Sequence, residues 1–129
     1  MALVYCPRTH ARFLQSKYPL AEILAAGVRV AIGTDSRATN PDLDFLTELR
    51  WTAQRHSEVS PENVLALGTT EAARALGDDE RGCIAVHKRA DLVVVESSGG
   101  NGNPWGWLVD DATPRIIAVV REGRPLGSA

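Results

Sequence analysis

The most regular hydrophobic pattern in the chain lies at residues 28–36, which read Val-Arg-Val-Ala-Ile-Gly-Thr-Asp-Ser. Apolar β-branched residues alternate with other residues as far as Ile32, and this alternation predicts a strand. Gly33 ends the pattern, so Asp35 follows just past the carboxyl end of the predicted strand. A short apolar run at residues 3–6 is ended by a proline and predicts a buried strand close to the N-terminus.

A helix is predicted between these two strands, over residues 19–26. Pro19 suits the first helical turn, leucines and an isoleucine share one face, and Gly27 follows as a C-cap. A strand, a helix and a second strand make a βαβ unit, whose strands run parallel with a right-handed crossover. Residues 8–13 are predicted as a loop at the carboxyl end of the first strand.

Capping signals predict three further helices, each preceded by a short polar residue that can act as its N-cap. They are expected at residues 42–54, 63–67 and 70–76, with Asn40, Ser60 and Thr69 as their N-caps. Prolines at the first positions of two of them, and Gly77 after the last, support this prediction.

The character of the chain changes after residue 80, where strands replace helices. Strands are predicted at 83–86, 90–96 and 115–121, with a tight turn at residues 122–123. A glycine-rich loop at 97–104 is expected to be held down by Trp105 and Trp107, and Asp91 to hold the hairpin through hydrogen bonds. The chain is therefore predicted as α/β over residues 1–80 and β-rich over residues 81–129.

Composition and charge exclude several classes of protein. The net charge is −2 and both signs are interspersed, which argues against binding to nucleic acid or to an anionic membrane. Without a membrane span or a signal peptide, a cytoplasmic protein is expected, and Cys6 and Cys83 are expected to be reduced thiols. The first buried strand begins almost at residue 1, which suggests the tail of a longer protein.

Five segments in a fixed order carry a family resemblance. They are residues 6–10, 31–35, 48–50, 69–77 and 88–94. Together they resemble the C-terminal third of a metal-dependent amidohydrolase of the cytosine deaminase and chlorohydrolase branch. The resemblance implies a partial TIM barrel, the last two βα units, over residues 1–80. It also implies a small β-sandwich-like region over residues 81–129.

The resemblance assigns chemistry to Asp35. It matches the family's aspartate at the end of strand eight, which binds a divalent metal, zinc above all, and takes a proton from the attacking water. Such a site would hydrolyse a carbon–nitrogen or carbon–halogen bond in a small-molecule substrate. From local sequence alone, a turn or N-cap role is the more common one for such an aspartate.

The histidines depart from the family pattern. The His-x-His pair and the two later histidine ligands are absent, so the chain alone is expected to hold no metal. His10 and Arg8 lie where the family's site opens and are predicted to contact substrate. For Arg8 the partner could equally be a carboxylate. The alternatives are a loop residue bonded to the backbone for His10 and a solvated charge for Arg8. His56 at a helix end and His87 in a hairpin turn are predicted to be structural.

Two functions from different classes follow. One is part of an amidohydrolase-type enzyme, inactive alone, with Asp35 as catalytic residue and metal ligand. The other is an autonomous non-catalytic domain that associates through its open sheet into a homo-oligomer, since two parallel strands leave both outer edges unpaired.

Overall fold

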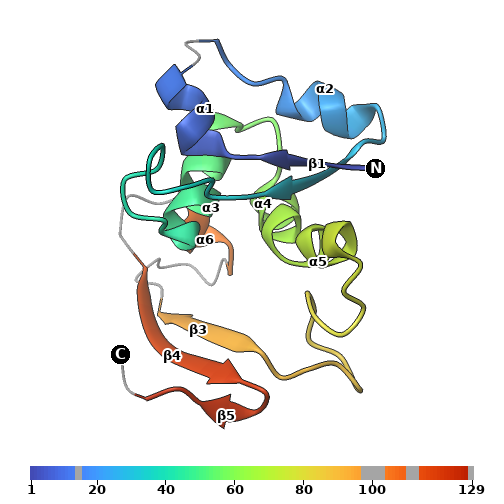
Figure 1. The fold of residues 1–129 in the computed structure, drawn as a ribbon, viewed down its shortest axis with the longest axis vertical. Helices are drawn as coiled ribbons and strands as arrows, with labels where there is room; N and C mark the ends of the chain where they lie inside the picture. Colours follow the sequence, from blue (N-terminus) through green and yellow to red (C-terminus); the bar gives the residue numbers. More distant parts are fainter. Residues whose placement is uncertain (14–15, 97–103, 110–113, 128–129) are drawn as a thin grey trace.

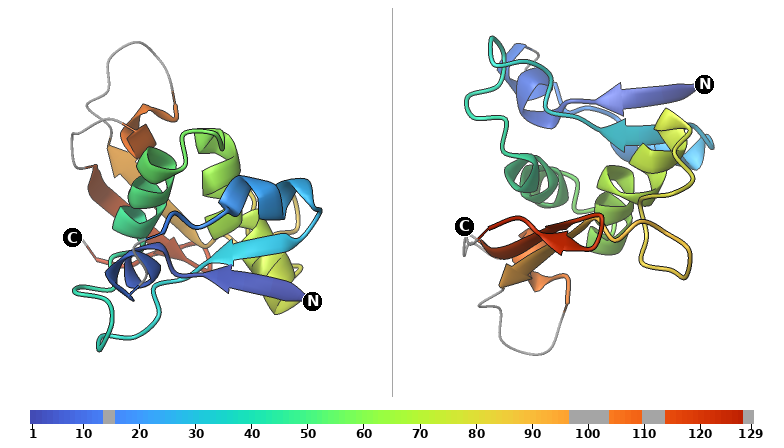
Figure 2. Two further views of the ribbon diagram at one scale, coloured as in Figure 1. Left: turned by 90° about the horizontal axis from the view of Figure 1, so that it is seen from above. Right: turned by 60° about the horizontal axis from the view of Figure 1, so that its bottom comes forward.

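The computed structural model describes residues 1–13, 16–96, 104–109 and 114–127 (Figure 1). A layer of helices separates a parallel sheet from an antiparallel one, and Figure 2 shows the two sheets on opposite sides of that layer. The architecture is mixed α/β, as the sequence predicts.

The parallel sheet contains two strands, β1 (Ala2–Tyr5) and β2 (Arg29–Ile32), which are connected through helix α2 (Leu20–Ala25). The register places Leu3 opposite Val30. This arrangement confirms the predicted strand–helix–strand unit and puts the carboxyl ends of both strands at one edge of the molecule.

Four helices accompany this sheet. They are α1 (Pro7–Phe13), α3 (Phe45–Arg55), α4 (Pro61–Gly68) and α5 (Thr70–Leu76). Three confirm predicted helices, but α1 replaces the loop predicted at residues 8–13. Pro7 ends the strand as expected, yet its fixed φ also suits the first position of a helix. The His10 N–H donates to the Cys6 carbonyl at 2.8 Å, which closes the first turn of α1.

Side-chain caps begin α3 and α4. The Ser60 hydroxyl accepts a hydrogen bond from the Asn63 N–H at 3.3 Å, as predicted. The predicted cap of α3 is wrong, because Asp44, not Asn40, accepts the Thr47 N–H at 3.1 Å. Asn40 is fully buried in the loop before the helix, where its side-chain amide donates to Glu48 and accepts the Leu43 N–H.

The junction between α4 and α5 differs from the prediction in one contact. Thr69 precedes α5 without capping it, since its hydroxyl donates back to the Leu65 carbonyl at 2.8 Å. Gly77 ends α5 with a left-handed φ of 69°, the conformation that favours glycine after a helix.

One face of the parallel pair packs against the helices. The buried apolar cluster contains Tyr5, Leu20, Val30, Ile32, Leu49, Ala53, Val59, Val64, Leu67 and Leu108. Each fully buried leucine, isoleucine or valine contributes about 1.5–3 kcal/mol. Side chains alternate between faces along a strand, and on the opposite face Val4 keeps 62% of its surface exposed.

The antiparallel sheet contains β3 (Leu92–Glu96), β4 (Arg115–Arg121) and β5 (Arg124–Pro125) in that order. These strands confirm the predictions for residues 90–96 and 115–121. They form one layer, and no second layer of a β-sandwich lies against them within the described part of the chain.

The strand predicted at residues 83–86 is wrong, because this segment forms bends and turns between α5 and β3. Ile84 and Val86 are 88% and 82% exposed, so an apolar alternation without a strand to pair with does not form a sheet. His87 lies in an exposed turn with a φ of 67°, as predicted, although no hairpin surrounds it. Asp91 accepts the Glu122 N–H at 2.7 Å, which confirms its predicted role in the hairpin.

A short helix, α6 (Gly106–Val109), joins the second part of the chain to the first by packing on α3. Leu108 is fully buried, and the Trp107 carbonyl accepts a hydrogen bond from Arg50 Nε at 3.1 Å. Trp105 and Trp107 are both packed against the core. Of the predicted loop at residues 97–104, all but the last residue lies outside the described residues.

None of the described helices has the length and apolarity needed to cross a membrane.

Candidate functional site at the carboxyl end of the parallel strands

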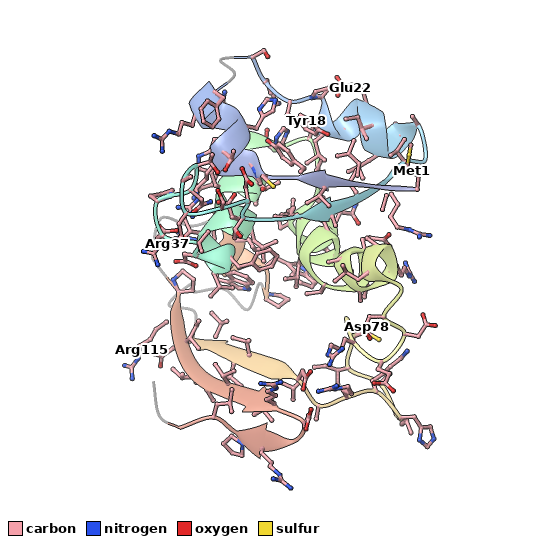
Figure 3. All side chains as sticks on the ribbon, viewed as in Figure 1. Met1, Tyr18, Glu22, Arg37, Asp78 and Arg115 are labelled. Carbon is pink, nitrogen blue, oxygen red and sulfur yellow. The ribbon has the colours of Figure 1, made fainter. Side chains whose placement is uncertain are left out.

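Asp35 follows β2 in an exposed loop and has a left-handed φ of 61°, a region that aspartate tolerates better than most residues. Its Oδ2 accepts a hydrogen bond from the Thr39 hydroxyl at 2.6 Å. Its Oδ1 accepts no hydrogen bond from the described residues. Arg37, labelled in Figure 3, marks this loop at the same end of the strands as α1.

The segments that follow β1 and β2 lie close together at Cys6 and Gly33. A Cβ on Gly33 would lie 2.9 Å from Val4 Cγ1 and 3.4 Å from Cys6 Sγ, and only the first of these is closer than real contacts allow. Burial, and then the nearby Asp35 carboxylate, raise the pKa of the Cys6 thiol, which therefore stays protonated at neutral pH. Cys6 and Cys83 are not joined in a disulfide.

Arg8 is held by carboxylates of the protein itself. Its Nε donates to Glu48 Oε1 at 2.6 Å and its Nη2 to Asp42 Oδ1 at 2.5 Å. The hydrogen bond with Asp42 raises the pKa of Arg8 and lowers that of Asp42 to about 2. The structure thus places Arg8 as the carboxylate partner that the sequence left open, and its contact with substrate stays a prediction.

Glu48 and Asn40 complete this network and were not predicted as site residues. Glu48 is fully buried on α3 and accepts Asn40 Nδ2 at 2.5 Å and the Arg8 N–H at 3.2 Å. Asn40 Oδ1 in turn accepts the Leu43 N–H at 2.9 Å and Arg8 Nη2 at 3.0 Å. Glu48 lies about 200° from Leu46 on the helical wheel, opposite the predicted apolar face, so the leucine pattern gave no signal of its burial.

His10 packs in a group of aromatic rings. Its ring meets those of Tyr5 and Tyr18 edge-on, with centroids 5.9 and 5.1 Å apart, and the two tyrosines stack at 4.0 Å. Tyr18, labelled in Figure 3, comes from the segment between α1 and α2. Within the described residues, no hydrogen bond or ion pair joins His10 or Arg8 to Asp35.

His56 is structural, as predicted, but for a different reason. The prediction placed it as a cation that favours the negative end of a helix. It is instead fully buried, and burial lowers its pKa, so the ring is neutral at neutral pH. Its Nε2 lies 3.1 Å from the Tyr5 hydroxyl and its Nδ1 3.3 Å from Glu58, which Lys17 contacts at 2.8 Å.

The described residues do not form a metal site by themselves. Among them, no group of three or more His, Cys, Asp and Glu side chains is close enough to hold a metal ion. Asp35 is the candidate ligand at this edge, and its neighbour Cys6 is protonated, whereas zinc sites take three or four protein ligands. The described residues alone therefore do not supply the ligands that a zinc ion needs.

A separate hollow of about 230 Å³ lies between α3 and β4. Its lining is Asp44, Leu46, Thr47, Arg50, Pro114 and Ile116. None of the three predicted site residues lines it, so the chemistry argued for Asp35 does not extend to this hollow.

The chain matches the Amidohydrolase family over residues 2–126. It is 34% identical to 5-methylthioadenosine/S-adenosylhomocysteine deaminase from Moorella thermoacetica over 104 residues, 74% of this chain and 24% of that protein. It is also 34% identical to 5'-deoxyadenosine deaminase from Methanothermobacter thermautotrophicus over 107 residues, 77% of this chain and 25% of that protein.

Solved structures agree with these matches. An adenosine deaminase from Xanthomonas campestris with bound zinc superposes on 96% of this chain with a TM-score of 0.84 and 31% identity. The zinc complex of atrazine chlorohydrolase from Arthrobacter aurescens, at 24% identity and a TM-score of 0.85, shares the fold over 98% of this chain. This chain covers 31% of each, and about a quarter of the curated relatives it matches. The chain belongs to the amidohydrolase family.

Proposed function

We propose that this chain forms the last two βα units of a TIM barrel and the adjoining β-rich part of a metal-dependent hydrolase. The hydrolase would act on a carbon–nitrogen bond of a small molecule, as a deaminase does. Support comes from the family match over residues 2–126 and from two parallel strands whose carboxyl ends lie at one edge. The relatives are named as deaminases of adenosine-type compounds, which suggests a ring amine as the group removed.

Asp35 carries the proposal, because it stands directly after β2, where parallel strands of α/β barrels place their functional groups. We assign it two roles, a ligand to a divalent metal and the base that takes a proton from water. The remaining metal ligands would come from outside the described residues, so the chain alone would be inactive. His10 is retained as the substrate contact, since α1 begins at the same edge.

A chimera tests this proposal. Residues 1–126 replace the matching segment of the Moorella deaminase, and deamination is followed by the change in ultraviolet absorbance of the adenine ring. We expect turnover in the chimera and a loss of about 10²–10⁴-fold on Asp35→Asn, the range for removing a catalytic base.

The matched control for the chimera is Asp91→Asn, which changes a carboxylate in the hairpin and should leave turnover intact. A chimera that folds, binds zinc like its parent and deaminates equally well with Asp35→Asn would contradict the role of Asp35. Turnover by the isolated chain would contradict its proposed inactivity.

A second proposal is self-association through the open sheet. Within the described residues, β1 and β2 pair only with each other, and Val4 is 62% exposed on the face away from the core. Sedimentation at increasing concentration should show a homo-oligomer that Val4→Glu dissociates. A strictly monomeric profile at the highest concentration would exclude it.

A further inference from the structure

The Asp35 side chain is held by a hydroxyl that the proposed function leaves without a role. The Thr39 hydroxyl lies 2.6 Å from Asp35 Oδ2 and 3.2 Å from the Ser36 carbonyl. The carboxylate is both the nearer and the charged acceptor, so the single hydroxyl proton is donated to it. Thr9, on α1, donates its own hydroxyl to Thr39 Oγ1 at 3.3 Å, which leaves the Thr39 proton for Asp35.

A hydrogen bond at the surface orients a carboxylate only if its donor is itself fixed, because water competes for both partners. Thr39 is fixed by its backbone: its N–H and that of Asn40 both donate to the Ser36 carbonyl, at 3.0 and 2.8 Å. Asn40 is fully buried and bound to Glu48 at 2.5 Å. The donor is therefore attached to the buried network, which binds one loop to two helices.

We propose that Thr39 is a positioning residue that holds Asp35 in one side-chain rotamer. The buried network of Arg8, Asn40 and Glu48 keeps Thr39 in place. The arrangement engages Oδ2 and leaves Oδ1 as the oxygen available to a ligand or a proton. Its importance for catalysis rests on the proposed function, whereas the geometry itself can be tested on the isolated chain.

Nuclear magnetic resonance measures this geometry directly. Three-bond couplings from Asp35 Cγ to its own backbone nitrogen and carbonyl carbon report the populations of the three χ1 rotamers. We expect couplings of a single dominant rotamer in the unaltered chain. In Thr39→Val they should move towards the average over the staggered rotamers, and Thr39→Ser, which keeps the hydroxyl, should restore them.

Thr47→Val is the matched control. Thr47 donates its hydroxyl to Asp44 Oδ2 at 2.8 Å, so the chain contains a second threonine–aspartate pair of nearly the same length. This variant should leave the couplings of Asp35 alone; those of Asp44 are held in addition by the Thr47 N–H, which the variant keeps. Protection of the Thr39 and Asn40 amides from hydrogen exchange should persist in Thr39→Val, which separates loss of the hydroxyl from loss of the loop.

Two results would overturn the proposal: averaged Asp35 couplings in the unaltered chain, or single-rotamer couplings that survive Thr39→Val. Neither depends on turnover. A failed deaminase assay therefore counts against the proposed function alone, and a mobile Asp35 counts against the positioning role alone.

Discussion

Two of the regions in which carboxylates contact arginines differ in burial. At the carboxyl end of the parallel strands, Glu48 is fully buried and its partner Arg8 has 13% of its side chain exposed. At the end of the antiparallel sheet, Asp91 bonds Arg81 at 2.9 Å with side chains 26% and 41% exposed. Both pairs join a carboxylate to a guanidinium, but only the first pair has been removed from water.

This difference decides what each pair does. An exposed pair exchanges water for a partner at little net gain, whereas a buried carboxylate without its partner keeps the whole cost of desolvation. The pKa of Asp91 is lowered first by the hydrogen bond from the Glu122 N–H and then by the one from Arg81. The Asp91 region therefore shapes a surface hairpin, while the Glu48 region holds the loop that carries Asp35.

Glu48→Gln should show the largest effect, because it leaves the Arg8 cation facing a neutral amide in a buried position. We expect a loss of about 3 kcal/mol in the free energy of unfolding, measured with denaturant. Asp91→Asn is the matched variant in the less buried region and should have a clearly smaller effect. Equal losses in the two variants would remove the distinction between the regions.

Gly33→Ala should have the next largest effect, again in the first region. The added Cβ would come within 2.9 Å of Val4 Cγ1, so the Val4 side chain or the strand that carries it must shift, at about 1–3 kcal/mol. Gly127→Ala, after the antiparallel sheet, meets nothing within 4 Å and should leave the thermal midpoint unchanged. An unchanged midpoint for Gly33→Ala would show that the parallel pair adapts without cost.

Acid should weaken the parallel-strand region first. Burial lowers the pKa of His56 below its unfolded value of about 6.5, so the unfolded chain binds a proton more readily than the folded one. Stability should then fall as pH drops below about 6.5. The pKa of Glu58 is lowered to about 2, chiefly by Lys17, so its contribution is lost only below its usual value of 4.5.

His56→Gln separates these two windows, because it removes the titrating ring that faces Tyr5, Glu58 and Arg55. In a pH series of denaturant unfolding, this variant should lose the fall in stability that begins near pH 6.5. It should keep the fall that begins near pH 4.5, which belongs to Glu58. If stability still falls below about pH 6.5 in this variant, a group other than His56 is responsible.

Zinc should have the smallest effect. The isolated chain, purified in the presence of zinc and dialysed, is expected to hold less than one equivalent, and added zinc should not raise its thermal midpoint. One equivalent by metal analysis that is lost on Asp35→Ala would contradict this prediction and make the chain a metal site in its own right.

Local signals explain which elements the sequence could predict. The alternation at β2, the apolar face of α2 and the glycine after it, which has a φ of 75°, act within a few residues. The position of Asp35 beyond β2 follows from the same signals. The mistakes at α1 and Asn40 arose where one signal suits two structures: a proline ends a strand or begins a helix, and an Asn-Pro pair caps a helix or makes a bend.

The Arg8–Glu48 contact could not be predicted in this way, because 40 residues separate its partners in sequence. Only the fold shows that an arginine and a glutamate at such separation share one buried position. The division at residue 80 stays a prediction, and so does the sandwich, whereas the family itself could be identified from the order of short motifs.

The parallel pairing also determines the order in which contacts can form while the chain is synthesised. β1 leaves the ribosome before β2, yet Leu3 finds its partner only at Val30 and Tyr5 reaches His56, 51 residues later. The pairing of β1 with β2 can therefore close only after α1 and α2 have been made, and the contact between Tyr5 and His56 only after α3. Such non-local contacts slow folding relative to contacts within one helix.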